Sequence, residues 1–295
     1  MFNDVRALNN PIIGEAYTDM FRNARDLVTG PDGAPLPRTD RNARTHLLLS
    51  ELFWSVAWIK QSEPEDYGRM ADRMGAILAD GIIAPGGRWP AFAIPRLSRD
   101  DDPSAEASPE LFLRAATGLI NEEGYHGASV ERISARLNVS KGAFYHHNET
   151  KDELVVACFR RTCDIMWRAI RAAEAEGGSG LKVLAQLSAA LVHHQLAGNL
   201  PLLRTSALTT APESLQPDLV RQFDRVSLRF ASIISDGIAD GSIRPIDVNV
   251  GAQMITAMIN ASAELNFWAP GLTWETAAAH YVRPCFEGLL SPVDA

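Results

Sequence analysis

The stretch that decides the fold is LNVSKGAFYHHNETKDEL, residues 137–154. Asn138 is one of the few residue types that tolerate a left-handed backbone, so the chain can end one helix and turn sharply there. Ser140 can cap a following helix, SKGAFYHH, and Thr150 with Glu153 can form the capping box of the next one. The spacing therefore predicts a tight turn between two short helices, with a further helix beginning after Thr150.

The residues before this stretch complete a small helical domain. PELFLRAATGLINEE, residues 109–123, places Pro109 at the first helical position and carries apolar residues at three- and four-residue spacing. Ser129 can cap VERISARL, residues 130–137, whose Ile133 and Leu137 share one face. We therefore expect three short helices with the turn between the second and third. In such a helix-turn-helix the second helix of the pair enters the DNA major groove, while the first crosses the backbone.

The side chains around the turn suit contact with DNA. Lys141 and Lys151 can neutralise phosphates, and Tyr145 can donate its hydroxyl to a phosphate oxygen. Gly142 and Ala143 carry no bulky side chain, so this end of the helix can approach base edges closely. The alternative is that this segment is a packing unit of a helical protein that never meets DNA.

The pattern AATGLINEEGYHGASVERISARLNVSKGAFYHHNETKDELV resembles the DNA-binding domain of TetR-family transcriptional regulators, and the resemblance covers residues 105–165. It implies a reader that starts at Ala128 and ends at His147. It also implies C-terminal helices, residues 166–295, that bind a ligand and dimerise through the last two of them. By position, the DNA-facing residues are Ser129, Val130, Ser140, Lys141, Gly142, Ala143, Tyr145, His146 and Lys151. The chain departs from the family pattern at Asn148, where an aromatic residue is usual, and in the acidic segment SRDDDPSAEAS before the first helix.

The composition restricts the class of protein and the partners that it can have. The 295 residues are 46% hydrophobic and 22% charged, with a net charge of −8, which is typical of a globular protein and disfavours indiscriminate coating of nucleic acid. No secretory signal is visible, and the longest apolar stretch, residues 46–59, contains Glu51 and is too short to span a bilayer. We therefore expect a cytoplasmic protein without membrane contact. Cys158, Cys163 and Cys285 lack metal-site or disulfide spacing, and we expect no metal or cofactor.

Apolar residues recur at helical spacing outside the Pro- and Gly-rich segments, and no run suggests a sheet, so we predict an all-α fold. The Pro-, Gly- and Asp-rich region predicts a linker at residues 86–104, between an N-terminal segment, residues 1–85, and the helix-turn-helix domain.

An internal repeat links the two ends of the chain. A shift of 207 positions lays Asp40 to Pro85 over Asp247 to Pro292 without a gap, with Ser55 on Ser262 and Gly81 on Gly288. The alternative is a coincidence between similar amphipathic helices. Given the resemblance, residues 1–85 look like the last helices of a second, partial TetR-like ligand domain. The two copies can then pair within one chain as a pseudo-dimer or between two chains.

Candidate effector-binding residues lie in the C-terminal part. Asn260 and Glu264 place two polar groups on an otherwise apolar helical stripe, where they can orient a ligand, pair across a subunit contact or face solvent. Adjacent histidines diverge on a helix, so a ligand-pocket or core role suits them better than metal binding. The candidate pocket residues are Trp167, His193, His194, Phe230, Asn260 and Glu264, with core packing as the alternative for the aromatic ones.

Enzymes are not indicated, because the sequence lacks GxSxG, P-loop, HExxH and dinucleotide-binding motifs. These patterns favour a DNA-binding transcriptional regulator, a ligand-responsive repressor of TetR type. We expect it to bind a palindromic operator as a homodimer and to respond to a small, largely apolar effector. The alternative is a TetR-like ligand-binding or protein-interaction module that has lost specific DNA binding.

Overall fold

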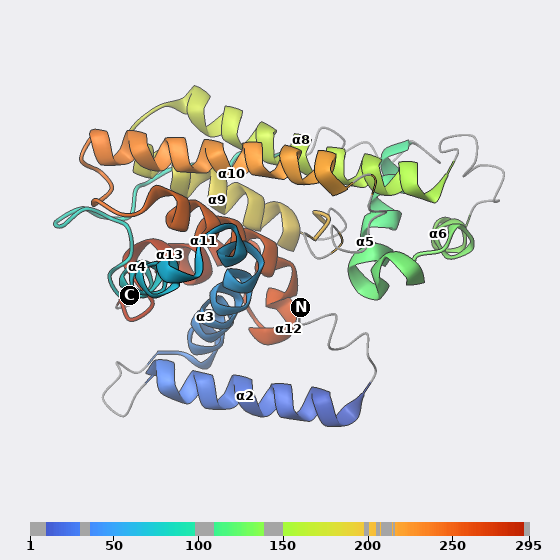
Figure 1. The fold of residues 1–295 in the computed structure, drawn as a ribbon, viewed down its shortest axis with the longest axis horizontal. Coiled ribbons are helices and arrows are strands. Elements are labelled where there is room, and N and C mark those ends of the chain that lie inside the picture. Colours follow the sequence, from blue (N-terminus) through green and yellow to red (C-terminus); the bar gives the residue numbers. More distant parts are fainter. Residues whose placement is uncertain are drawn as a thin grey trace. The chain divides into compact units, whose positions relative to one another are not determined.

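The structure, a computed structural model, describes residues 10–29, 36–97, 109–138, 150–197, 201–204, 207, 214 and 216–291. The described residues are helical apart from connecting segments and one isolated antiparallel bridge between Ile83 and Ile243 (Figure 1). The predicted all-α class is confirmed. Among the helices of the described ranges, none combines the length and the apolar character needed to cross a membrane.

The longer helices are α2 (Pro11–Thr29), α3 (Arg38–Trp58), α4 (Tyr67–Asp80), α5 (Pro109–Gly127), α6 (Val130–Leu137), α8 (Lys151–Glu176), α9 (Gly180–Leu196), α10 (Gln216–Ala239) and α11 (Val248–Ala261). Shorter elements are the helices α12 (Leu265–Trp268) and α13 (Arg283–Glu287), the 3₁₀ turns η1 (Ile59–Gln61), η2 (Pro64–Asp66) and η4 (Ser262–Glu264), and the π-helical turn η5 (Ala278–Val282). They form two compact units, with boundaries inside α2, α8 and α10.

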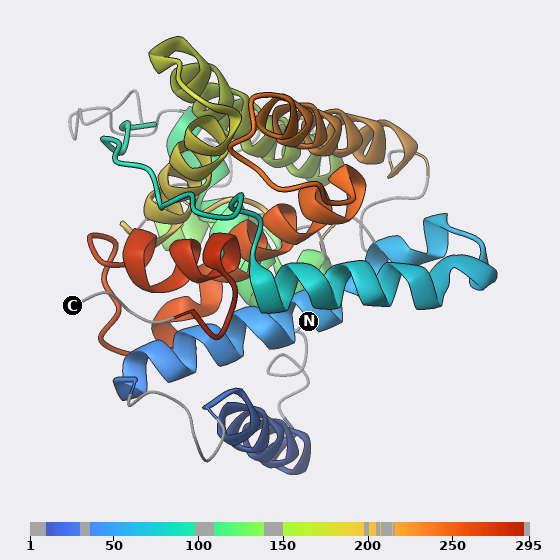
Figure 2. The ribbon, with the colours of Figure 1, turned by 90° about the vertical axis from the view of Figure 1, so that its left-hand side faces the viewer.

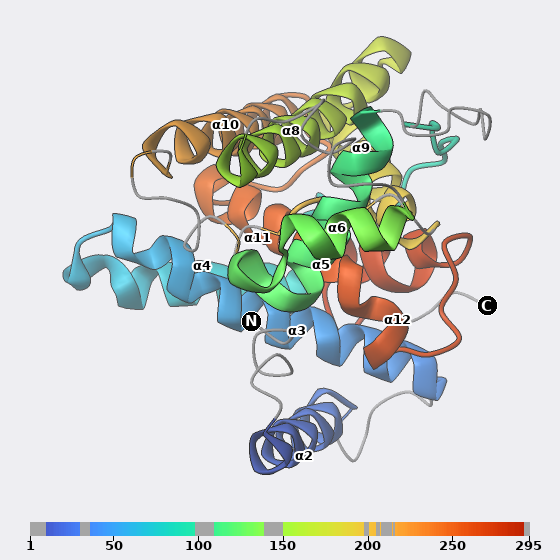
Figure 3. The same cartoon turned by 90° about the vertical axis from the view of Figure 1, so that its right-hand side faces the viewer.

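Unit 1 consists of Met1–Glu15, Leu97–Arg168 and Gly198–Val226, as far as these are described. Its helices α5, α6 and the start of α8 enclose one apolar core (Figure 3). The core side chains are Phe112, Ala116, Leu119, Ile120, Ala128, Ile133, Leu154, Val155, Cys158, Phe159, Leu203, Ala207 and Leu219. Phe112 and Phe159 are fully buried, and each such side chain contributes about 1.5–3 kcal/mol relative to exposure.

Unit 2 consists of Ala16–Arg96, Ala169–Ala197 and Ser227–Ala295. Its centre is the contact between α3 and α11, and α4 meets α13 beside them. In Figure 2 the blue α3 and cyan α4 lie next to the orange and red C-terminal helices. Helices α3 and α4 from the first third of the sequence therefore share one core with the C-terminal helices.

The first part of the expected linker belongs to unit 2. The Trp89 ring packs edge-on against Phe286, with ring centroids 5.2 Å apart. The Gln186 side chain donates a hydrogen bond of 2.8 Å to the Ala93 carbonyl. The unit boundaries differ from the expected domain limits, because residues 16–96 share a unit with the C-terminal helices and residues 198–226 share one with the helix-turn-helix domain.

Candidate nucleic-acid interface and effector groove

The caps predicted at Ser129, Asn138 and Thr150 are present, whereas the predicted cap at Ser140 lies outside the described residues. The Ser129 side chain accepts a hydrogen bond from the Arg132 backbone N–H, and Ser129 begins α6. Asn138 ends α6 in a left-handed conformation with φ 55° and ψ 42°. Thr150 and Glu153 bond reciprocally at 3.2 Å in the predicted capping box. Both chain ends that lead into residues 139–149 are thus fixed by local hydrogen bonds.

The hinge between α5 and α6 is also fixed. The helical backbone of α5 is interrupted at Gly124, with φ 74° and ψ 173°, directly after the predicted end of this helix at residue 123. Arg136 of α6 then bonds Glu122 with two nitrogens at 2.8 and 2.9 Å, and Arg132 pairs with Glu123. A bidentate arginine–carboxylate pair fixes orientation as well as distance. These pairs therefore set the angle at which α6 leaves α5.

The predicted DNA-facing residues divide into described and undescribed ones. Ser140, Lys141, Gly142, Ala143, Tyr145 and His146 lie outside the described residues, as does Asn148. Val130 is half-buried and packs against the core of unit 1, so it holds α6 in place. Lys151 starts α8 and is half-buried, and this burial lowers the pKa of its ammonium group. Ser129 is occupied as the helix cap.

A short segment at residues 201–204 joins the helices of this domain and carries no sequence signal that predicts it. The Asn121 side-chain amide donates to the Leu202 carbonyl at 2.8 Å and accepts from the Arg204 N–H at 3.0 Å. From α8, the Thr162 hydroxyl accepts the Leu203 N–H at 2.8 Å, and buried Arg161 donates to the Pro201 carbonyl at 3.0 Å. The segment that follows α9 in sequence is therefore tied to both α5 and α8.

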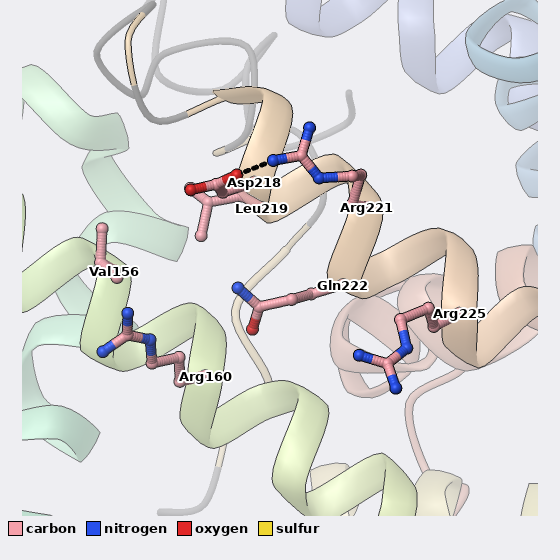
Figure 4. Close-up of a pocket in the computed structure, with 7 residues that line it drawn as sticks. All are labelled: Val156, Arg160, Asp218, Leu219, Arg221, Gln222 and Arg225. Carbon is pink, nitrogen blue, oxygen red and sulfur yellow. Dashed lines mark hydrogen bonds and ion pairs between the residues drawn. The ribbon is translucent and has the colours of Figure 1, made fainter.

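A groove of about 310 Å³ lies between the unit 1 parts of α8 and α10 (Figure 4). Its lining residues are Val156 and Arg160 from α8, and Asp218, Leu219, Arg221, Gln222 and Arg225 from α10. This volume lies at the lower end of the usual range for small-molecule sites.

The groove is positively charged. Asp218, its single acidic lining residue, is paired with Arg221, which leaves the charges of Arg160 and Arg225 uncompensated by any carboxylate of the lining. In Figure 4, Gln222 extends from α10 toward α8, and Arg160 lies on α8 beside Val156. Leu219 provides a buried apolar floor. Guanidinium groups bind carboxylates and phosphates well, so the groove suits an organic anion with a small apolar part.

None of the six predicted pocket residues lines this groove. Phe230 and His194 are buried, and His193 meets the edge of the Trp274 ring at a centroid distance of 4.7 Å. Burial and the nearby charge of Arg96 lower the pKa of His193. Trp167 is half-buried on α8 within unit 1.

The two polar residues of the predicted stripe have local partners. Asn260 donates to the Thr256 carbonyl at 3.0 Å, one helical turn earlier. Burial, and after it the Glu264 charge, raises the pKa of Tyr17. Burial also raises the pKa of Tyr281, with smaller contributions from Glu51, Cys285 and Glu264 in that order. Because Tyr17 comes from α2, Glu264 lies where the second copy of the repeat meets this N-terminal helix. Among the described residues, no group of histidine, cysteine and carboxylate side chains could hold a metal ion.

Comparison with known proteins agrees with this architecture. Residues 112–158 match the model of a family described as bacterial regulatory proteins, tetR family. The Transposon Tn10 TetC protein of Escherichia coli is 41% identical over 52 residues, which are 18% of this chain and 26% of that protein. The chain therefore spans about a quarter of the length of this curated relative.

Solved structures extend the likeness beyond the helix-turn-helix. The ketosteroid transcriptional regulator KstR2 of Mycobacterium tuberculosis superimposes with a TM-score of 0.51 at 18% identity, over 60% of this chain and 92% of KstR2. AibR, solved with isovaleryl coenzyme A and operator DNA, has a TM-score of 0.51 at 21% identity, over 61% of this chain and 98% of AibR. At these identities the likeness shows the fold.

The match at residues 112–158 shows a DNA-binding domain of tetR-family type, and the solved structures show the fold, so both agree with the predicted resemblance to TetR-family regulators. Nearly complete regulators cover about three fifths of the chain. About two fifths of it is therefore additional to one regulator unit.

Proposed function

We propose that the chain regulates transcription by binding operator DNA through the reader at residues 128–147. The observation that carries this proposal is the frame around the reader. α6 ends at Asn138, α8 begins with the Thr150 capping box, and the family match spans the region between them. This frame presents Lys151 at the start of α8, next to the helix predicted to enter the major groove.

The regulator acts as a ligand-responsive repressor. A ligand that binds better to the conformation unable to fit the operator lowers DNA affinity by linkage. In unit 1, the segment at residues 201–204 is bonded to α5 and to α8, and the groove lies between α8 and α10. An occupant of the groove therefore acts on the same helix, α8, whose start supports the reader.

The effector combines an anionic group with an apolar part. Arg160 and Arg225 supply positive charge, whereas Val156 and Leu219 supply apolar contact. This chemistry fits acyl thioesters of coenzyme A, the class to which the ligand of AibR belongs. The sequence predicts a largely apolar effector, and the arginines of the groove add the requirement for an anionic group.

A DNA-binding titration tests the proposal. The purified chain is added to the DNA upstream of its own gene and to a scrambled duplex, over a series of salt concentrations. Operator binding predicts selective binding that falls steeply with salt, with a slope near −0.9 per phosphate contact. Equal affinity for both duplexes, or no binding at low salt, would contradict it.

The competing function is a ligand-binding or protein-interaction module that has lost specific DNA binding. It is favoured by Asn148 in place of an aromatic residue and by the acidic segment at residues 98–108. Effector binding without selective DNA binding in the same titration would support this second function.

A further inference from the structure

The two copies of the repeat exchange partners in a reciprocal way within unit 2. Arg73 of the first copy pairs with Asp247 of the second. His280 of the second copy lies 2.8 Å from the carboxylate of Asp40 in the first. A shift of 207 positions turns Arg73 into His280 and Asp40 into Asp247, so each pair is the image of the other. Residues that exchange partners in this way are the signature of an interface with two-fold symmetry.

The ends of the last helices show the same exchange. Gly81 follows α4 and Gly288 follows α13, and both have positive φ, 66° and 101°. After Gly81, the Ile82 N–H bonds the Phe286 carbonyl at 2.7 Å; after Gly288, the Leu289 N–H bonds the Leu78 carbonyl at 2.8 Å. Each copy thus ties its chain, just past its glycine, to the final helix of the other copy.

The two copies are nevertheless fitted to each other and are not interchangeable. Arg44 of the first copy is buried and donates to the Leu289 and Ser291 carbonyls, both at 2.6 Å. Its equivalent in the second copy is Gly251, which has no side chain that could donate in place of the Arg44 guanidinium. If the second copies of two different chains paired at this face, the Leu289 and Ser291 carbonyls of each chain would therefore lack this buried donor.

Further contacts join helices α2 and α3 to the C-terminal part of unit 2. The Phe21 ring of α2 stacks on Trp268 with centroids 4.4 Å apart. The Trp54 indole N–H donates to the Gln253 side chain at 3.1 Å. Because the two copies belong to one chain, their effective concentration is high, and pairing within the chain is favoured over pairing between chains.

From these contacts we infer that residues 36–85 occupy, within the same chain, the face through which the resemblance implies that TetR-family regulators dimerise. The 295-residue chain is then a monomer that places one reader on a single operator half-site. The half-site part of this inference rests on the proposed DNA-binding function, whereas the occupied face does not.

A disulfide tests the occupied face directly. Ile83 and Ile243 face each other in an antiparallel bridge, flanked by bonds from the Ala84 N–H to the Ser242 carbonyl and from the Arg244 N–H to the Ile82 carbonyl. This pattern places their Cα atoms about 4.5 Å apart, within the range of a disulfide. The full-length variant Ile83→Cys with Ile243→Cys should therefore oxidise within one chain. The Ile83→Cys and Ile243→Cys single variants are the controls.

The expected result is a single band at the mass of one chain, 32.2 kDa, on non-reducing gels, and the same mass by light scattering of the wild-type chain at micromolar concentration. A disulfide-linked band of twice that mass would overturn the inference, because the copies would then pair between chains. A wild-type dimer with an intrachain disulfide would overturn the monomer part, because chains would join through another surface. The wild-type mass is informative even if the cysteine variant fails to fold.

Selection from random duplex DNA tests the half-site. A single reader should enrich one asymmetric motif, and the oxidised and reduced double-cysteine variant should bind it with affinities within about twofold of each other. Enrichment of an inverted repeat would overturn the single-reader inference. A monomer with an intrachain disulfide that enriches no motif would leave the occupied face established and contradict the proposed DNA-binding function instead.

Discussion

Gly81 and Gly288 lie against each other's helix ends, at a distance that admits no side chain. A Cβ added to Gly81 would lie 2.1 Å from the Phe286 carbonyl oxygen, and one added to Gly288 would lie 2.3 Å from the Ala79 carbonyl oxygen. Both contacts are with backbone atoms, which cannot move aside as the end of a flexible side chain would. The pairing of the two copies therefore depends on glycine at both positions.

Gly81→Ala should destabilise the fold. At Gly81, φ is 66° and ψ is −162°, a backbone conformation that is essentially restricted to glycine. Strain and overlap together should lower the free energy of unfolding by about 2–4 kcal/mol. Urea titration gives the measurement. Gly75→Ala on the same helix is the control: nothing lies within 4 Å of its added Cβ, so it should be neutral or stabilising by up to about 1 kcal/mol. Equal losses in both variants would contradict this account.

Glu51 gives the fold a pH dependence. Its side chain is buried, and burial raises the pKa of the carboxyl well above the usual value. Burial, and after it the charge of Glu51, also raises the pKa values of Tyr281 and Cys285. Because the folded state then binds a proton that the unfolded state has lost, stability falls as pH rises above about 4.5.

Glu51→Gln should remove this loss of folding stability at higher pH. The variant should be more stable than the wild-type chain, and the difference should widen with pH, by up to about 1.4 kcal/mol per pH unit. Urea titrations at pH 5, 7 and 8.5 measure the difference. A difference that stays constant or shrinks with rising pH would show that Glu51 keeps its charge in the folded chain.

Asn121 couples residues 201–204 to the DNA-binding domain. Asn121→Ala removes both hydrogen bonds and leaves the Arg204 N–H and the Leu202 carbonyl without them. We expect a loss of about 1–3 kcal/mol in unfolding free energy and weaker operator binding. Asn249→Ala, at an exposed position on α11, should change neither quantity. Operator affinity that is unchanged by Asn121→Ala would argue against a role of this segment in positioning the reader.

The arginines of the groove should control the response to an anionic effector. With isovaleryl coenzyme A as the probe, the Arg160→Ala, Arg225→Ala double variant should need at least about tenfold more ligand to release operator DNA, since a charge-assisted hydrogen bond contributes about 1.5–3 kcal/mol. Arg69→Ala is the control, because Arg69 is exposed on α4 and pairs with Asp66. An equal response of the double variant and the wild-type chain would exclude the groove as the effector site.

Local signals in the sequence predicted much of the DNA-binding domain. The Ser129 cap, the left-handed Asn138 and the Thr150–Glu153 box are confirmed, because each depends on residues only three or four apart. The predicted repeat has a structural counterpart, since its aligned residues exchange partners. Identities at a constant spacing are visible in a sequence even when the contacts between them are not.

Contacts between distant residues could not be predicted in the same way. Arg44 donates to carbonyls more than 240 positions away, and no spacing rule connects the two. Arg160 and Arg225 come together because α8 and α10 lie side by side, and arginines at these positions otherwise resemble a solvated helix face. The six predicted pocket residues rest on polarity and aromatic character along single helices, and none of them lines the groove. Polarity and aromatic character on one helix do not indicate which other helices lie opposite it.

The most direct test of the central claim, DNA binding through residues 128–147, compares Lys141→Ala with Lys60→Ala in the operator titration. Lys141 belongs to the predicted recognition helix, whereas Lys60 is an exposed lysine of the N-terminal segment. If Lys141 contacts a phosphate, Lys141→Ala should weaken binding and reduce the salt slope by about 1, the loss of one phosphate contact. Lys60→Ala should leave the slope unchanged. Identical slopes for Lys141→Ala and the wild-type chain would contradict the claim.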